Sequence, residues 1–279
     1  MILVDYSPIA ISNIFSEKVN MGEENLIRHM ILNSVRAYRK KFFSKYGEMI
    51  FAIDSNNNWR KEYFPQYKEN RKKTRDKNPE MWEKLYQHLD MIKNEISENF
   101  HYPVIEIDGC EADDVIGALA RKAKNPTLIL SGDKDFAQLQ TNPNIDQFSP
   151  VQKKWIKHDD PVNFLLEQVY RGDADDGVPN VLSDDDVFIR DDKKQTIMTQ
   201  KRFDEIWNSN IDDLPDNVQK NIARNRKMIR LDHLPKELNQ KIINRYESYE
   251  GTRKNAPKVL NYLVKNDCKL LIDHVEDFL

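Results

Sequence analysis

Short apolar runs alternate with longer helix-like segments through the first half of the 279-residue chain, and no other feature constrains the fold as much. Four runs of four or five residues are too short for helices and indicate buried strands. The segments between them carry apolar residues at helical spacing. This order implies parallel strands joined by right-handed crossovers. The expected strands are residues 1–4, 49–53, 104–107 and 127–130, and the expected helices are residues 24–45, 79–99 and 111–124.

The second half of the chain has a different character. A helix is expected from Pro161, and after an acidic, loop-like segment at residues 183–192 the pattern is helical only. The sequence therefore predicts an α/β domain with a central, mostly parallel sheet flanked by helices over residues 1–180, and a smaller all-α region over residues 181–279. The expected helices of the latter are residues 201–207, 215–229, 235–246, 256–264 and 270–278.

Composition excludes several classes of protein. No apolar run approaches the roughly 18 residues of a membrane span, and the N-terminus does not read as a signal peptide. Cys110 and Cys268 are too few for a disulfide framework or a thiolate zinc site. The GxxxxGKS/T and GxGxxG phosphate loops are absent. We expect a cytoplasmic protein with no membrane partner, whose chemistry, if it is an enzyme, rests on carboxylates.

The net charge of −3 would by itself argue against a nucleic-acid partner, but the charge is unevenly distributed. Between residues 60 and 77, eight basic residues stand against three acidic ones, with aromatic residues among them. Such interleaving suits base stacking with phosphate contact, although a solvated charged loop is an equal alternative. Two further basic segments, residues 153–157 and 220–230, fit a plain hairpin or helix surface as well as a nucleic-acid contact.

Carboxylates follow all four expected strands, and those after the third are Asp108 and Glu111. Parallel strands end at the same edge of a sheet, so these side chains should meet there. Asp113 and Asp114 join Glu111 at the start of the helix that follows the third strand, and a Gly/Pro turn at residues 172–179 adds another pair. The acids concerned are Asp5, Asp54, Glu111, Asp113, Asp114, Asp133, Asp135, Asp173 and Asp176.

This cluster of acids predicts bound metal ions. Like charges a few ångströms apart raise each other's pKa values unless cations neutralise them. Oxygen ligands without His or Cys select Mg²⁺ or Mn²⁺ rather than zinc. Two separated acid groups suggest two ions, which can hold the attacking and leaving oxygens of a phosphodiester. A single Asp after a strand more often caps a helix or forms a turn. The hypothesis of bound metal ions therefore rests on all these acids occurring together.

At these motifs the chain resembles the flap endonuclease, or 5′-nuclease, family, and within it the T4-like bacteriophage ribonuclease H branch. The resemblance covers most of the chain and implies a PIN-like catalytic domain with an arch at about residues 56–80 over a 5′ single strand. The matching residues are 3–7, 28–34, 53–54, 59–61, 67–71, the Glu111-Ala112-Asp113-Asp114 motif, 131–136, 138–139, and Gly172-Asp173 with Asp176.

The resemblance implies a Mg²⁺-dependent, structure-specific 5′ nuclease that removes RNA primers, 5′ flaps and adjacent DNA during replication by two-metal phosphodiester hydrolysis, with Mn²⁺ able to substitute. It implies a first metal site formed by Asp5, Asp54, Asp113 or Asp114, and Asp133, with Glu111 beside them. It implies a second site formed by Asp135, Asp173 and Asp176. It places Arg60, Lys68 and Arg71 near the scissile phosphate. The nucleic-acid-binding residues expected are Arg60, Lys61, Tyr67, Lys68, Arg71, Lys72, Lys73, Arg224 and Lys227.

The expected partners are DNA and RNA–DNA hybrids with 5′ ends or flaps. We also expect a monomer that contacts replication proteins such as a single-strand-binding protein or a clamp, in the host cytoplasm if the chain is phage-encoded. Acidic residues 183–192 replace the family's glycine-rich helix-hairpin-helix, so the C-terminal region is expected to be a degenerate form of that DNA-binding motif.

Two alternatives stay open. One is a PIN-type ribonuclease, against which the chain length and the second acid group count. The other is a non-catalytic DNA-binding replication factor of the same fold, against which the retention of every metal-site acid counts.

Overall fold

A six-stranded sheet in the order β3-β2-β1-β4-β5-β6 forms the centre of the molecule. The computed structural model describes residues 1–16, 22–249 and 253–279. Strands β1 to β5 are parallel, and β6 pairs antiparallel with β5 at one edge. The predicted, mostly parallel α/β architecture is confirmed. The strands are β1 Ile2–Asp5, β2 Met49–Ile53, β3 Val104–Glu106, β4 Thr127–Leu130, β5 Ile145–Ser149 and β6 Lys154–Ile156.

The sequence pattern does not reveal β5 and β6, because neither contains an apolar run. In β5 the polar Gln147 is buried, and its side-chain amide donates to the carbonyl oxygens of Ser131 and Asp133. A strand whose buried polar groups are paired in this way lacks the periodicity that marks apolar strands. The basic segment at residues 153–157 includes β6, so it belongs to a hairpin.

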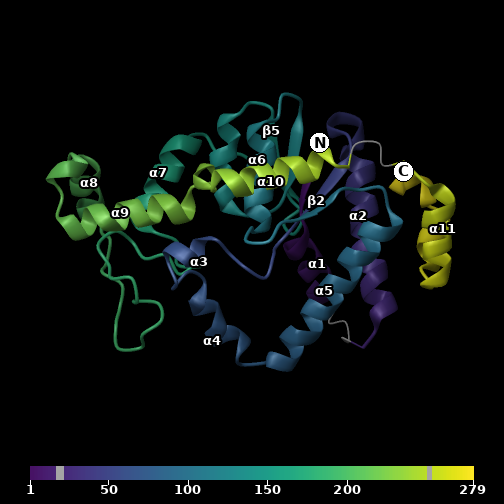
Figure 1. Ribbon diagram of the computed structural model, residues 1–279, viewed down its shortest axis with the longest axis horizontal. Helices are drawn as coiled ribbons and strands as arrows, with labels where there is room; N and C mark the ends of the chain where they lie inside the picture. Colours follow the sequence, from purple (N-terminus) through teal and green to yellow (C-terminus); the bar gives the residue numbers. More distant parts are fainter. Residues whose placement is uncertain (17–21, 250–252) are drawn as a thin grey trace.

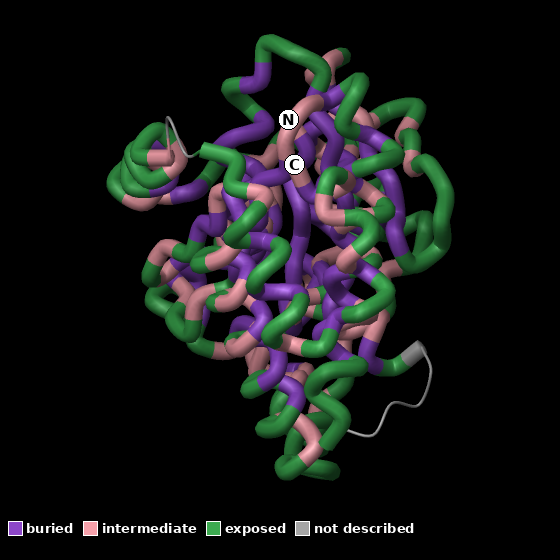
Figure 2. Tube along the Cα trace, turned by 90° about the vertical axis from the view of Figure 1, so that its right-hand side faces the viewer, coloured by how far each residue is buried: buried purple, intermediate pink, exposed green. Residues whose placement is uncertain are grey.

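Helices cover both faces of the sheet (Figure 1). On one face lie α1 Tyr6–Ser16, α2 Glu24–Tyr46 and α5 Pro79–Asn99, and on the other α6 Ala112–Arg121 and α10 Lys236–Glu247. Alternate strand residues supply the two cores: Ile2 and Val4 face the first, and Leu3 faces the second. Figure 2 shows the buried chain running through the middle of the molecule with exposed segments around it. The expected helices occur, except that the helix expected at residues 270–278 is a short α-helix, Lys269–Ile272, followed by a separate 3-10 helix, Val275–Phe278; α1 was not expected.

The C-terminal helices reach both ends of the molecule. α11 Ala256–Lys265, α12 Lys269–Ile272 and η5 Val275–Phe278 pack beside α2 and α5. At the opposite end, α7 Pro161–Arg171, α8 Gln200–Trp207 and α9 Asp216–Ile229 form a small core of their own (Figure 1). The division at residue 180 remains a prediction.

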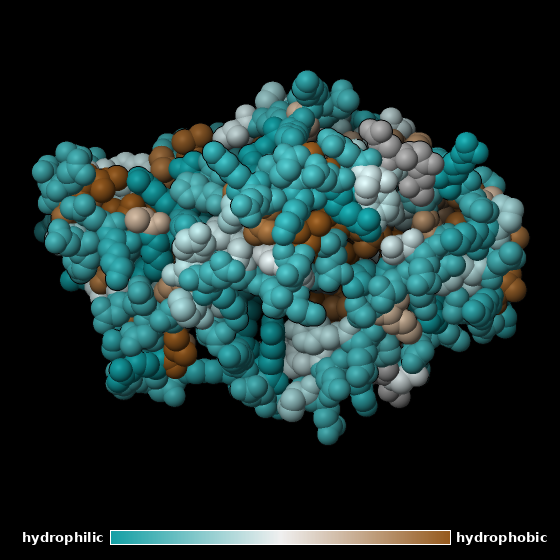
Figure 3. Space-filling view, in the orientation of Figure 1, coloured by the Kyte–Doolittle hydropathy of each residue, from teal (hydrophilic) through white to brown (hydrophobic). Residues whose placement is uncertain are grey.

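The arch, residues 56–80, crosses from β2 to α5. It contains α3 Arg60–Tyr63, η1 Glu69–Arg71 and α4 Lys72–Arg75. Asn78 caps α5 by accepting a hydrogen bond from Met81 N at 3.3 Å, as the Asn-Pro pattern predicts. Figure 3 shows the surface hollowed between α4 and the body of the molecule. In the part of the chain described here, no helix is both long and apolar enough to cross a membrane.

Candidate metal and nucleic-acid site

Three of the predicted acids lie beyond the carboxyl ends of neighbouring strands. Asp5 is the last residue of β1, Asp54 follows β2, and Asp133 follows β4. Because β1 pairs in parallel with both β2 and β4, these positions share one edge of the sheet. Asp5 is 4% exposed and accepts a hydrogen bond from Ser131 Oγ at 2.7 Å, while Asp54 accepts one from Ser7 Oγ at 3.0 Å.

Helix α6 turns Asp114 into the interior. Its carboxylate is fully buried and binds the Arg60 guanidinium through two hydrogen bonds of 2.9 and 2.8 Å. The indole N–H of Trp59 and the backbone N–H of Glu111 also donate to it, at 3.1 and 3.0 Å. With both of its oxygens occupied, Asp114 lies in a buried ion pair rather than on the open carboxylate surface.

The neighbouring Asp113 faces the acids at the strand ends. Burial, followed by repulsion from Asp133 and Asp5, raises the pKa of Asp113 well above its ordinary value. The sequence left open whether Asp113 or Asp114 would be the ligand. The geometry favours Asp113, because Arg60 already neutralises Asp114.

A second group of acids comes from η2, Lys134–Thr141, and from the turn that follows α7. Asp173 and Val178 exchange backbone hydrogen bonds of 2.8 and 2.7 Å across this turn. Gly172 has a φ of +73°, and a Cβ there would lie 2.4 Å from the carbonyl oxygen of Val178, so only glycine fits. The turn brings Asp173 toward Asp135 of η2, and the Gln168 amide donates to both carboxylates.

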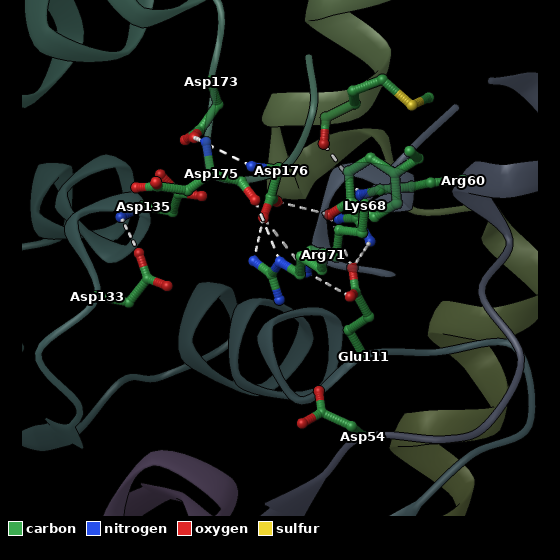
Figure 4. A network of polar contacts seen from close by, with 12 residues as sticks. Asp54, Arg60, Lys68, Arg71, Glu111, Asp133, Asp135, Asp173, Asp175 and Asp176 are labelled. Carbon is green, nitrogen blue, oxygen red and sulfur yellow. Dashed lines mark hydrogen bonds and ion pairs between the residues drawn. The ribbon is translucent and has the colours of Figure 1, made fainter. Parts of the chain in front are cut away.

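The arch is anchored on the same turn. Lys68 has a left-handed φ of 58°, and its backbone N–H donates to the carbonyl oxygen of Asp176 at 2.8 Å. Its ammonium group donates to Oε1 of Glu111 at 2.5 Å and lies 3.6 Å from Oδ1 of Asp176. Arg71 donates to the same Asp176 oxygen at 2.6 Å. Figure 4 shows the basic side chains of Lys68 and Arg71 directed toward these two acids.

Burial and like charge perturb the carboxylates that lack a basic partner. Burial, followed by repulsion from Asp54, raises the pKa of Asp5 to about 8. Burial, followed by repulsion from Asp133 and Asp173, raises the pKa of Asp135 to about 7. Raised pKa values of this kind mean that these carboxyls are fully ionised at neutral pH only when positive charge lies beside them, and the described side chains do not supply that charge.

Other acids of the cluster are balanced by the chain itself. Burial opposes the ionisation of Glu111, but Lys68 and Arg60 lower its pKa to about 2. Burial likewise opposes the ionisation of Asp173, but a hydrogen bond from Lys134 lowers its pKa below the ordinary value. A bound cation would therefore be most stabilising near the strand-end acids and Asp135, which the protein's own basic side chains do not neutralise.

The donor set fits a hard divalent cation. Within residues 1–16, 22–249 and 253–279, no three His, Cys, Asp or Glu side chains are arranged to hold a metal ion. Burial and mutual repulsion nevertheless raise the pKa values of Asp5, Asp113 and Asp135, which places these carboxylates near other acids and short of positive charge. Carboxylate oxygens of this kind suit Mg²⁺ or Mn²⁺. The residues that could hold such ions are Asp5, Asp54, Asp113 and Asp133 in one group, and Asp135, Asp173 and Asp176 in the other.

Two residues expected to contact nucleic acid are buried. Arg60 and Tyr67 are each 2% exposed. The Tyr67 hydroxyl lies 2.9 Å from a Glu111 oxygen and 2.7 Å from an Asp176 oxygen. The expectations of base stacking by Tyr67 and of direct phosphate contact by Arg60 are therefore revised, because both side chains are enclosed by the site's own carboxylates.

Arg224 is also engaged within the protein. It binds Asp185 of the acidic segment and donates to the carbonyl oxygen of Pro179 at 2.9 Å. By contrast, Lys227 is partly exposed, and its ammonium lies 3.1 Å from the ring centroid of the half-exposed Tyr63. Of the arch lysines expected to contact nucleic acid, Lys61, Lys72 and Lys73 are exposed, each in a surface ion pair.

Four further residues of the site were not among those predicted from the sequence. Ser7, Ser131 and Lys134 lie within the sequence motifs but bind carboxylates in the structure. Gln168 belongs to no motif. The one signal in the sequence is its position: Gln168 follows Leu165 by three residues, so this polar side chain shares the apolar side of α7.

Two family models together match almost the whole chain. The model of the 5′-3′ exonuclease N-terminal, resolvase-like domain matches residues 2–165. The model of the T4 RNase H C-terminal region matches residues 162–278.

Individual proteins agree with this assignment. The chain is 29% identical to the ribonuclease H of Enterobacteria phage T4 over 294 residues, which cover 99% of this chain and 95% of the phage protein. It is 31% identical to the 5′-3′ exonuclease of Buchnera aphidicola subsp. Schizaphis graminum over 198 residues, which cover 65% of each chain.

Solved structures of a bacteriophage T5 nuclease share the fold. The T5 protein co-crystallised with metal ions has a TM-score of 0.65 and 16% identity, covering 89% of this chain and 99% of the phage protein. The T5 5′-exonuclease with bound zinc has a TM-score of 0.63 and 16% identity, covering 90% and 99%. The resemblance seen in the motifs is thus confirmed, and the chain belongs to the 5′-3′ exonuclease family of nucleases, with a C-terminal region of the T4 ribonuclease H type.

Proposed function

We propose that this chain is a divalent-metal-dependent 5′ nuclease, with 5′-3′ exonuclease and flap endonuclease activity. The observation that carries the proposal is the meeting, at one edge of the sheet, of two carboxylate groups with Lys68 and Arg71 of the arch (Figure 4). Oxygen ligands beside fixed cations are the combination that hydrolysis of a phosphodiester requires.

We assign one ion to Asp5, Asp54, Asp113 and Asp133, with Glu111 beside them, and a second ion to Asp135, Asp173 and Asp176. Mg²⁺ is the proposed ion, with Mn²⁺ able to replace it. When bound, the two ions would stabilise the attacking and leaving oxygens of the phosphodiester. Asp114 is left out of this assignment because Arg60 occupies both of its oxygens.

The basic residues have different proposed roles. Burial opposes the charge on Lys68, but Asp176 and Glu111 raise its pKa above the ordinary value. Its ammonium therefore stays protonated at neutral pH, and it offsets phosphate charge rather than acting as a base. Arg71, whose side chain is 41% exposed, can reach the same phosphate. Arg60 is a positioning residue that holds Glu111 and Asp114 in place.

The exposed part of the arch suits a single strand. Lys61, Lys72 and Lys73 of the arch supply positive charge, as does Lys227 of α9 over the ring of Tyr63, which is 56% exposed and supplies an aromatic face. Phosphate contact with stacking is the usual way to hold single-stranded nucleic acid.

The proposed substrates are DNA and RNA–DNA hybrids with 5′ ends or flaps, and the proposed role is removal of RNA primers and adjacent DNA during replication. The relatives support this choice: one is a ribonuclease H, one a 5′-3′ exonuclease, and a bacteriophage T5 flap endonuclease of the same fold has been solved with DNA and metal ions. A monomer in the host cytoplasm that contacts a single-strand-binding protein or clamp completes the proposal.

Adjacent aspartates provide a matched test. Asp176 is 16% exposed and faces the arch cations, whereas Asp175 is 89% exposed. On a labelled 5′-flap duplex and an RNA-primed duplex with Mg²⁺, wild type and Asp175→Asn should cut alike, and Asp176→Asn should be slowed at least about 100-fold. Absence of cleavage by the wild-type protein, or equal rates for the two variants, would contradict the proposal.

A further inference from the structure

Gln168, on the buried side of α7, joins two carboxylates from different segments of the chain. Its Nε2 donates to Oδ1 of Asp135 at 2.5 Å and to Oδ2 of Asp173 at 3.1 Å. The residue is 9% exposed. Asp135 belongs to η2 and Asp173 to the turn after α7, so one amide fixes the separation of two acids that the backbone does not connect directly.

Chemistry sets the orientation of this amide. When these acids hold an ion, both are ionised and only accept hydrogen bonds, so the NH₂ group must face them and the carbonyl oxygen must point elsewhere. That oxygen, Oε1, is buried and has no hydrogen-bond partner in the described structure. It is bonded to the same carbon as Nε2 and therefore lies within about 2.6 Å of it. A buried, unpaired acceptor thus lies beside the second acid group.

The neighbouring groups cannot satisfy this oxygen. The two acids are acceptors, and the nearby Lys134 ammonium is engaged by Asp173 at 3.0 Å. Buried polar groups without partners are unfavourable and rare. A ligand that brings O–H donors would complete the site, and Mg²⁺ bound by carboxylates keeps several of its waters.

We propose that Gln168 is a positioning residue of the second metal site. Its NH₂ group holds Asp135 and Asp173 at one separation, and its Oε1 accepts a hydrogen bond from a water of the ion's hydration shell. Partners of ligating carboxylates act on metal affinity in this way. The inference rests on the proposed function only in its assumption that these acids bind an ion.

Metal binding without DNA tests this role. In Mn²⁺ titrations by calorimetry, the wild-type protein should bind two ions. Gln168→Met, which fills similar volume without an amide, should weaken one of them about 10- to 100-fold and leave the other unchanged. The cleavage rate of Gln168→Met should recover at higher Mn²⁺ concentration, which a general folding defect would not allow.

Gln138 provides the matched control. Gln138 lies on η2, as Asp135 does, but its amide touches no carboxylate. It donates to the backbone oxygens of Asp135 and Ile229 and accepts from Leu231 N. Gln138→Met should therefore bind both ions with wild-type affinity.

A second variant covers the case in which Gln168→Met does not fold. Gln168→Glu keeps the shape but adds a third negative charge, so it should lower the metal-free melting temperature, and Mn²⁺ should raise that temperature by more than in wild type. Wild-type affinity at both ions in Gln168→Met, or no larger Mn²⁺ effect in Gln168→Glu, would overturn the role of Gln168. A wild-type protein that binds two ions but does not cut nucleic acid would overturn the proposed function and leave this inference standing.

Discussion

Replacing Arg60 by methionine should destabilise the protein strongly, because it leaves a carboxylate buried without its partner. The guanidinium binds Asp114 through hydrogen bonds of 2.9 and 2.8 Å, and the two side chains are 2% and 0% exposed. Arg60 also donates to Glu111 at 3.2 Å and to the carbonyl oxygen of Met228 at 2.9 Å. The variant loses all four contacts.

The distances indicate the size of the effect. At 2.8 Å and an effective dielectric constant of about 20, the attraction between Arg60 and Asp114 is about 6 kcal/mol, but both groups lose their hydration. Removing one partner of a buried pair typically costs about 3–5 kcal/mol, which for a chain of this size lowers the melting temperature by about 10 °C. The double variant Arg60→Met/Asp114→Asn removes both charges and should regain at least about half of the loss.

Thermal and urea unfolding, followed by circular dichroism in EDTA at pH 7, measures these differences. Arg190→Met is the control, because its ion pair with Asp192 has side chains 54% and 63% exposed and should contribute little to the free energy of unfolding. A loss below about 1 kcal/mol in Arg60→Met, or a double variant less stable than the single one, would refute the reasoning.

Three further predictions concern acid stability, backbone geometry and turnover. Burial opposes the ionisation of Glu48, but Arg39 and a neighbouring histidine lower its pKa to about 2. The ionised Glu48 carboxylate therefore contributes about 2 kcal/mol to the free energy of unfolding above pH 4.5, and this contribution is lost as the pH falls toward 2. The free energies of unfolding of wild type and Glu48→Gln should converge over that range, and a constant difference would contradict the assignment. Gly172 and Gly47 have similar positive φ values of +73° and +81°, but a Cβ would lie 2.4 Å from a backbone oxygen at Gly172 and would meet nothing within 4 Å at Gly47. In urea unfolding, Gly172→Ala should therefore lower the free energy of unfolding by at least about 2 kcal/mol more than Gly47→Ala does. Equal losses would refute the steric argument. Lys68→Ala should lower kcat about 100-fold with KM nearly unchanged in steady-state cleavage assays, and a rise in KM alone would exclude a role in the transition state.

The elements predicted from the sequence are those with strong local signals. The apolar runs at residues 49–53 and 127–130 became β2 and β4, and the Asn78-Pro79 pair marked the start of α5. β5 escaped prediction because its buried Gln147 is satisfied by donating hydrogen bonds to the loop after β4, a pairing that no local pattern reveals. The order of the strands in the sheet likewise required the structure.

The site divides in a similar way. The acids could be found from the sequence because they follow strands, begin a helix or lie in a Gly/Pro turn. The sequence could not decide between Asp113 and Asp114, since adjacent residues of one helix differ in direction by about 100° and only the position of Arg60 determines which one is neutralised. The burial of Tyr67 and the role of Gln168 depend on segments that meet only in the fold.

The sequence by itself determined the α/β class, the family and the set of acids, because these follow from periodicity and from residues that lie near one another in the chain. The tertiary structure decided which charges face one another. Arg60, Lys68 and Arg71 lie within twelve residues of each other, yet the first is enclosed with Asp114, while the other two meet Asp176 more than a hundred residues away. The physical reason is that pairing depends on distance and burial in three dimensions, and the crossing of the arch over the Gly172–Pro179 turn sets both.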